Sequence, residues 1–188
     1  MAGAPVAIAF LRAVNVAGHG RLAMTDLARA VTSLGGTDAV TVLQTGNAVF
    51  RLPAGTAPDA FAAALADRLA ADPGVATEVI VRLGKDWSAT LAANPFPAVA
   101  AETPRKLVVM PLRNTPDAAR VAALAAAIAG REEVAAVGTT LFAVYPDGVG
   151  RSKLTTALIE KTLGTRGTGR NFDTARKIET AALTLSAA

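Results

Sequence analysis

The sequence predicts an α+β protein whose N-terminal half has a ferredoxin-like βαββαβ order and packs with a second α+β half of order βαββαα. Short apolar runs of strand length alternate with helical stretches whose apolar residues recur every three or four positions. Short turns that contain a glycine, at residues 44–47 and 138–139, join two pairs of these runs as hairpins. The 188 residues are 52% hydrophobic and 18% charged, so a sizeable core is expected.

The first half follows from its apolar patterning. Residues 6–11 are apolar at every position, which is typical of a central strand buried on both faces, with the second half or the last helix covering one of them. The other expected elements are a helix from Thr25, as its N-cap, to Leu34; a hairpin of residues 40–43 and 48–52 around the turn 44–47; a helix opened by Pro58; and a strand at 77–82.

The second half begins after a connector that contains three prolines. We expect domains at residues 1–84 and 106–188, with a helix and a Pro-rich connector at 85–105. The elements expected there are a strand at 106–110; a helix from Pro116 to Ala129 capped by Thr115; a hairpin of residues 134–137 and 140–145; a helix capped by Ser152; and a last helix at 174–185.

The composition excludes several kinds of site. Without cysteine, the chain has no disulfide, thiolate metal site or cysteine nucleophile. His19 is the only histidine and has no second ligand in its motif, so no metal site is predicted. We predict no cofactor. No apolar run reaches the roughly 20 residues that cross a bilayer, and the N-terminus lacks a signal-peptide pattern, so we predict a cytoplasmic protein with no membrane partner.

The positive charge is concentrated near the C-terminus. The net charge is +4, and residues 151–177 alone carry seven basic and two acidic residues. Such a segment would attract nucleic acid, a phosphorylated metabolite or an acidic protein surface. The alternative is a basic face that only contacts solvent.

The stretch 146–171 has the residue types of an anion site. Gly148 and Gly150 precede Arg151, Ser152 and Lys153, where Ser152 is expected to cap a helix. A helix N-terminus offers unpaired N–H donors and the positive end of the helix dipole. Arg170 and Asn171 precede the last helix, which Asn171 is suited to cap.

Polar residues also follow the first strand and form the first hairpin turn. Arg12 and Asn15 follow a buried strand, where a charged group is expected to pair or to face a cleft. Gln44 and Asn47 belong to the turn, and for Asn47 turn formation is the stronger interpretation.

Five motifs together resemble a known family. They are FLRAVNVAG (10–18), LQTGNAVF (43–50), ANPF (93–96), GRSKL (150–154) and RNFDT (170–174). In this order they resemble the DUF1697 family of bacterial proteins of unknown function. The resemblance implies an α+β fold with a ferredoxin-like N-terminal half and implies no activity. It suggests a shared site, whose convergence in space is our hypothesis, formed by Arg12, Asn15, Gln44, Asn47, Arg151, Ser152, Lys153, Arg170 and Asn171.

These observations favour a protein that binds a phosphate-bearing ligand in a basic polar cleft. Arg12, Arg151, Lys153 and Arg170 would hold the anion. A nucleotide, a phosphometabolite or a nucleic-acid backbone would each fit, although aromatic residues for base stacking are only 4% of the chain. Two alternatives stay open: an enzyme on a small phosphorylated substrate, for which the sequence identifies no nucleophile or base, and an interaction or oligomer-forming module with a basic face. The sequence leaves the oligomeric state open.

Overall fold

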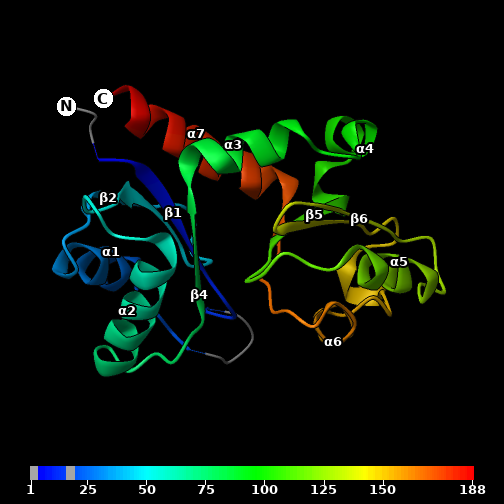
Figure 1. Cartoon of the computed structure of the whole chain (residues 1–188), viewed down its shortest axis with the longest axis horizontal. Coiled ribbons are helices and arrows are strands. Elements are labelled where there is room, and N and C mark those ends of the chain that lie inside the picture. Colours follow the sequence, from blue (N-terminus) through cyan, green and yellow to red (C-terminus); the bar gives the residue numbers. More distant parts are fainter. Residues whose placement is uncertain (1–3, 16–19) are drawn as a thin grey trace. The chain divides into compact units, whose positions relative to one another are not determined.

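The structure, a computed structural model, describes residues 4–15 and 20–188. Within them the chain forms seven α-helices and two antiparallel four-stranded sheets, which confirms the α+β class (Figure 1). The chain divides into two compact units: unit 1 is Met1–Ser88 with Lys177–Ala188, and unit 2 is Ala89–Arg176. The boundaries fall within α3 (Gly84–Ala92) and α7 (Phe172–Ala187). The predicted domain limits and the finer ferredoxin-like assignment stay predictions.

Unit 1 has the element order that its sequence predicts. Its elements are β1 (Val6–Leu11), α1 (Met24–Ser33), β2 (Thr37–Thr41), β3 (Asn47–Arg51), α2 (Pro58–Ala71) and β4 (Val79–Leu83). The strand order is β2-β3-β1-β4. β1 is central and antiparallel to both neighbours, with Ile8 opposite Val49 on one side and Arg82 on the other.

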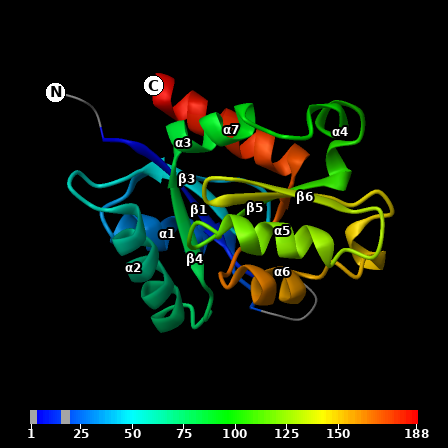
Figure 2. The ribbon, with the colours of Figure 1, turned by 45° about the vertical axis from the view of Figure 1, so that its right-hand side comes forward.

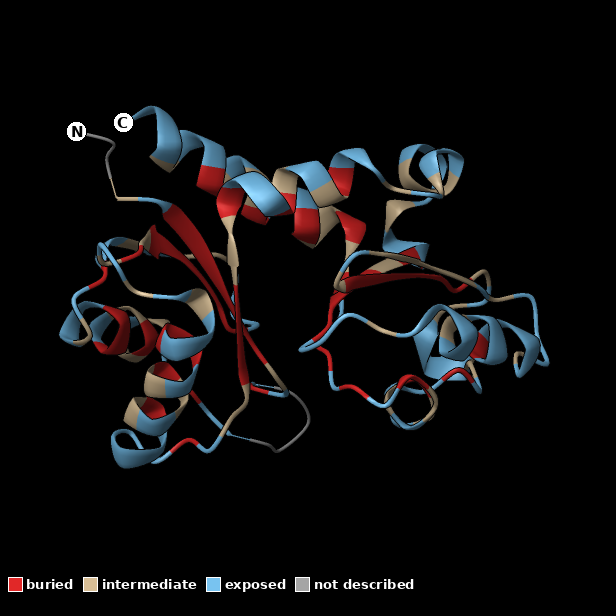
Figure 3. Cartoon of the chain, viewed as in Figure 1, coloured by how far each residue is buried: buried red, intermediate tan, exposed pale blue. Residues whose placement is uncertain are grey.

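Both faces of β1 are covered, and all six of its residues are buried, as predicted (Figure 3). On one face, α1 and α2 pack their apolar residues, including Leu27 and Leu65, against the sheet (Figure 1). On the other face, the rings of Phe10 and Trp87 lie 4.8 Å apart. The last part of α7 also reaches this unit, where the Arg51 guanidinium donates to the Leu185 carbonyl at 2.9 Å.

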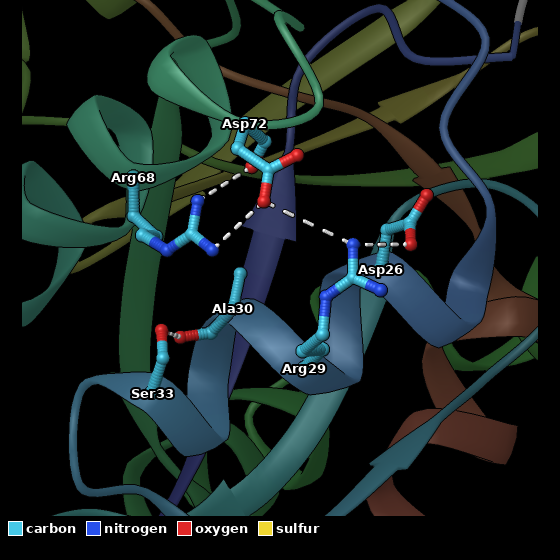
Figure 4. A network of polar contacts seen from close by, with 6 residues as sticks. All are labelled: Asp26, Arg29, Ala30, Ser33, Arg68 and Asp72. Atoms are coloured by element: carbon cyan, nitrogen blue, oxygen red, sulfur yellow. Dashed lines mark hydrogen bonds and ion pairs between the residues drawn. The ribbon is translucent and has the colours of Figure 1, made fainter.

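A polar network links α1 to the end of α2 (Figure 4). Arg68 donates to the carboxylate and the backbone carbonyl of Asp72, at 3.0 and 2.9 Å. Arg29 binds Asp26 at 2.8 Å and approaches Asp72 at 4.0 Å. Because these groups are partly exposed, each pair stabilises the fold by about 0–1 kcal/mol, far less than the apolar packing beneath.

Unit 2 contains a strand that the sequence analysis does not predict. Its elements are α4 (Pro97–Glu102), the 3₁₀ turn η1 (Pro104–Lys106), β5 (Leu107–Pro111), α5 (Ala118–Ala126), β6 (Glu133–Val137), β7 (Thr140–Val144), the 3₁₀ turn η2 (Val149–Arg151), α6 (Thr156–Leu163) and β8 (Arg170–Asn171). β8 pairs with β5 and completes the strand order β6-β7-β5-β8. A two-residue strand of Arg and Asn has no apolar alternation, so its sequence carries no strand signal.

Helices α5 and α6 cover one face of the sheet in unit 2. α5 and α6 lie side by side (Figure 2) and bury Leu124 and Ile159 against Met110 and Leu141 of the sheet. In the part of the chain that the structure describes, no helix is both long enough and apolar enough to cross a membrane.

The predicted caps of α1 and α5 are wrong. α1 begins at Met24 after Ala23, so Thr25 lies inside the helix. α5 is capped by Asp117, whose carboxylate accepts from the Ala119 N–H at 2.7 Å, so Thr115 is not its cap. α5 also ends at Ala126, and the residues that follow form a loop.

Replacing Gly46 with alanine tests how closely the first hairpin turn approaches the end of β1. Gly46 and Gly55 have nearly equal φ angles, +73° and +76°, but a Cβ at Gly46 would lie 2.3 Å from Val14 and 2.8 Å from Leu11, whereas one at Gly55 meets nothing within 4 Å. We expect both Ala substitutions to cost about 1–2 kcal/mol of backbone strain. Gly46→Ala should cost about 1–3 kcal/mol more from overpacking. Urea unfolding measures both, and equal losses would contradict the close contact.

Candidate functional site

The nine predicted site residues are divided between the two units. Arg12, Asn15, Gln44 and Asn47 belong to unit 1, and the other five belong to unit 2. Their convergence into one site stays a hypothesis, and each group is described within its own unit.

Asn15 joins two loops of unit 1. Its Nδ2 donates to the carbonyls of Leu22 and Gln44, at 2.9 and 2.8 Å, and its Oδ1 accepts from the Leu22 N–H at 2.9 Å. Asn15 also has a left-handed φ of 55°, which Asn adopts more readily than most residues. The side chain therefore holds the loop after β1 against the hairpin turn. Gln44 takes part through its backbone carbonyl, and its side chain is exposed.

Asn47 is fully buried and shapes the hairpin turn. Its Nδ2 donates to the Val42 carbonyl at 2.9 Å and to the Thr45 hydroxyl at 3.0 Å. These bonds are the turn chemistry that the sequence favours for Asn47.

Arg12 lies at the edge of a cavity of about 450 Å³ in unit 1. Its guanidinium is 3.8 Å from the Glu78 carboxylate, and the Thr77 hydroxyl donates to its carbonyl at 2.8 Å. Arg12 thus both pairs and faces a cavity, the two outcomes expected for a charge after a buried strand. The neighbouring loop residue His19 lies outside the described residues.

Three of the five predicted residues of unit 2 line one cavity of about 360 Å³, which we call the Ser152 cavity. It lies between the loop after α5 and the loop that leads from β7 to α6. Its polar lining comes from Arg131, Glu132, Asp147, Arg151, Ser152 and Lys153, and its apolar lining includes Ile128, Leu154 and Leu158. The early end of α5 leaves residues 127–132 free to form one wall.

Ser152 does not cap α6, which corrects the prediction. Thr155 is the cap, and its hydroxyl accepts from the Leu158 N–H at 3.2 Å. The Ser152 hydroxyl instead accepts from the Leu154 N–H at 2.9 Å and donates to the Glu132 carboxylate. Arg151 and Lys153 therefore act in this cavity as exposed cations before the helix and not as residues of its first turn.

The charges of the Ser152 cavity are mixed. Arg131 pairs with Asp147 across the rim, and the Ser152 hydroxyl holds the pKa of Glu132 below its usual value by hydrogen bonding to the carboxylate. Behind the lining residue Leu154, buried Tyr145 donates its hydroxyl to the Leu154 carbonyl at 3.1 Å, and burial raises the pKa of Tyr145 to about 12. The cavity thus offers cations to an anion and carboxylate acceptors to hydroxyl or amino groups.

Sequence reasoning missed Arg131 and Asp147 as parts of this cavity. It missed Glu132 as well, which lines the cavity although its neighbour Glu133 does not. The available signal was the polar loop after α5, together with an acidic residue in the turn before Arg151. Nothing in the sequence shows that these two loops meet.

Arg170 and Asn171 form β8 and have structural partners. Arg170 is buried, and its guanidinium donates to the Thr168 hydroxyl at 2.7 Å and to the Gly169 carbonyl at 2.9 Å. Burial lowers the pKa of Arg170 to about 10, so it stays charged at neutral pH. The Asn171 side chain accepts from the Thr174 N–H at 2.9 Å in the first turn of α7, which confirms its capping role.

The described part of the chain has no cluster of metal-ligating side chains. Residues 4–15 and 20–188 contain no group of three or more His, Cys, Asp or Glu side chains that could hold a metal ion.

Residues 5–142 match the model of a family described as a protein of unknown function (DUF1697). The chain belongs to the DUF1697 family. The matched range ends before residues 150–154 and 170–174, so the last two motifs of this DUF1697 protein lie outside it.

A solved structure shares the fold. The conserved bacterial protein SP0830 from Streptococcus pneumoniae is similar with a TM-score of 0.73 and 17% identity, over 95% of this chain and 98% of that one. At this identity the likeness concerns the fold alone. No curated protein sequence matches this DUF1697 chain.

Asn15→Ala tests whether Asn15 supports the loops of the DUF1697 chain. It removes three hydrogen bonds, so we expect a loss of about 1–3 kcal/mol in the free energy of unfolding. Gln44→Ala is the matched control, because only the backbone of Gln44 is used, and it should change stability by less than about 0.5 kcal/mol. Urea unfolding measures both. Equally small losses of stability in the two variants would contradict the structural role of Asn15.

Ser152→Ala tests the hydrogen bond to Glu132. Without the hydroxyl donor, the pKa of Glu132 should rise toward its usual value. The bond's contribution to stability is present above the unfolded-state pKa and is lost as pH falls through the lower folded-state pKa. The destabilisation by Ser152→Ala should therefore be larger at neutral pH than in acid, where only the lost hydrogen bond from the Leu154 N–H still contributes.

An NMR titration of the Glu132 carboxyl carbon measures this shift. Ser186→Ala, which removes a hydroxyl from α7, is the control and should leave the titration of Glu132 unchanged. An identical Glu132 pKa in wild type and Ser152→Ala would refute the hydrogen bond.

Proposed function

We propose that this protein binds a small phosphate-bearing molecule in the Ser152 cavity. The observation that supports this most is the combination of two exposed cations, Arg151 and Lys153, with an apolar lining in a cavity of about 360 Å³. Small-molecule sites commonly have volumes of about 300–1,000 Å³ and combine apolar walls with a few polar groups.

The charge distribution favours a small ligand over a nucleic-acid backbone in this cavity. Glu132 and Asp147 offset two of the three cations that line it. An extended polyanion would be repelled by these carboxylates, whereas a small molecule can place its phosphate near the cations and its hydroxyl groups near the carboxylates.

The residues have separable roles in the proposed complex. Arg151 and Lys153 hold the phosphate through charge-assisted hydrogen bonds. Glu132 and Asp147 accept hydrogen bonds from the body of the ligand, and Leu154 and Leu158 contact its apolar part. Contributions from Arg12, Asn15, Gln44, Asn47, Arg170 and Asn171 to the same ligand stay a hypothesis. We propose a cytoplasmic location, where phosphorylated metabolites are abundant.

The test is calorimetric titration with glycerol 3-phosphate, with glycerol as the ligand that lacks the phosphate. Arg151→Gln/Lys153→Gln should weaken binding by at least about tenfold, because each charge-assisted hydrogen bond contributes about 1.5–3 kcal/mol. The control Lys106→Gln/Lys177→Gln removes the same charge from exposed positions outside the cavity and should bind as wild type does.

Backbone NMR shifts during the same titration should locate the ligand at residues 127–132 and 147–154. Absence of binding by glycerol 3-phosphate, or equal weakening in the control variant, would overturn the proposal.

A further inference from the structure

A second group of cations lies in unit 2, outside the Ser152 cavity. Arg113, Lys161 and Arg166 line an open hollow of about 520 Å³, which we call the Arg113 hollow. Its other lining residues are Asn114, Ala157, Glu160, Gly164 and Thr165. The two cavities share no lining residue.

The backbone holds two of these cations beside each other. The Arg113 N–H donates to the Arg166 carbonyl at 2.8 Å, and the Asn114 N–H donates to the hydroxyl of buried Thr165 at 3.0 Å. The segment after β5 and the segment after α6 are thus joined at two successive positions. Arg113 and Arg166 are held on one surface by this ladder although they are far apart in the sequence.

Arg120 adds a fourth cation at the rim. Gly164 ends α6 with a left-handed φ of 68°, and a Cβ there would lie 2.3 Å from Nη1 of Arg120. The guanidinium of Arg120, from α5, therefore lies directly over this glycine, and α5 runs beside α6 (Figure 2). All four cationic residues are exposed.

The hollow differs chemically from the Ser152 cavity. Among the described residues that line it, Glu160 is the one carboxylate, and it accepts from the Gly167 N–H at 3.1 Å. Ala157 is the one apolar side chain there, and no aromatic ring is present for a base to stack on. The surface therefore offers positive charge with neither an apolar wall for a small molecule nor a stacking platform for single strands.

We propose that Arg113, Arg120, Lys161 and Arg166 contact the phosphate backbone of a double-stranded nucleic acid. Exposed cations bind backbone phosphates by releasing counterions and need no base contact. The proposal stands apart from the small-molecule site, because the two use different residues. Binding should be independent of sequence.

The test is fluorescence anisotropy with a labelled DNA duplex of arbitrary sequence, between 50 and 200 mM salt. Four phosphate contacts predict that wild-type affinity falls about 150-fold over this range. The variant Arg113→Gln/Lys161→Gln keeps two phosphate contacts. Its affinity should be weaker than that of the wild type at 50 mM salt and should fall only about 12-fold between 50 and 200 mM. The controls Lys106→Gln/Lys177→Gln and Arg151→Gln/Lys153→Gln should keep the wild-type salt dependence. Thermal unfolding checks that every variant is folded.

Several outcomes would overturn this inference. They are no duplex binding by wild type at 50 mM salt, an unchanged salt dependence in Arg113→Gln/Lys161→Gln, and an equal loss in either control. Binding of polyglutamate with the same affinity and salt dependence would assign the hollow to acidic protein surfaces instead of nucleic acid. Loss of duplex binding with glycerol 3-phosphate binding retained would leave the small-molecule proposal intact.

Discussion

Burial of β1 on both faces is the constraint on which unit 1 depends. As the central strand, β1 pairs its backbone with β3 on one side and β4 on the other. Its side chains then need an apolar cover on each face, and each large side chain that is buried contributes about 1.5–3 kcal/mol. α1 and α2 provide one cover. Trp87 of α3 contributes to the other, and α7 returns its last part to the same unit.

Burial of apolar side chains explains why some elements of the fold could be predicted from the sequence and others could not. A run without polar residues at 6–11 predicts a strand covered twice, and Leu65 and Leu69 at helical spacing predict the buried face of α2. β8 had no such signal, because Arg170 and Asn171 join the sheet through backbone pairing. The caps of α5 and α6 were also misplaced, since several Ser, Thr and Asp residues near a helix start compete for one position, and α1 begins after Ala23 without a side-chain cap.

The predicted site residues separate into those that shape loops and those that face open space. The side chains of Asn15 and Asn47 hydrogen-bond to groups of their own loops and turn, and Asn171 caps a helix. A motif of polar residues is equally compatible with ligand binding and with loop formation, because the same amide groups can hydrogen-bond to a ligand or to the backbone of a turn. Only the positions of the hydrogen-bond partners in the folded chain distinguish these two roles. For Arg151 and Lys153, the sequence identified the cations, but the carboxylates facing them come from loops that meet only in the folded chain.

The basic C-terminal segment shows why net charge alone does not identify a ligand. Residues 151–177 supply cations to two separate surfaces of unit 2, one with Arg151 and Lys153 and one with Lys161 and Arg166. At the first, Glu132 and Asp147 reduce the local charge, and apolar residues provide a wall. At the second, Arg113 and Arg120 add charge from another part of the chain. At physiological salt, screening limits the electrostatic interaction of each exposed charge to a range of about 8 Å. The nearest neighbours of a cationic side chain therefore decide whether it suits a compact phosphate ester or an extended polyanion.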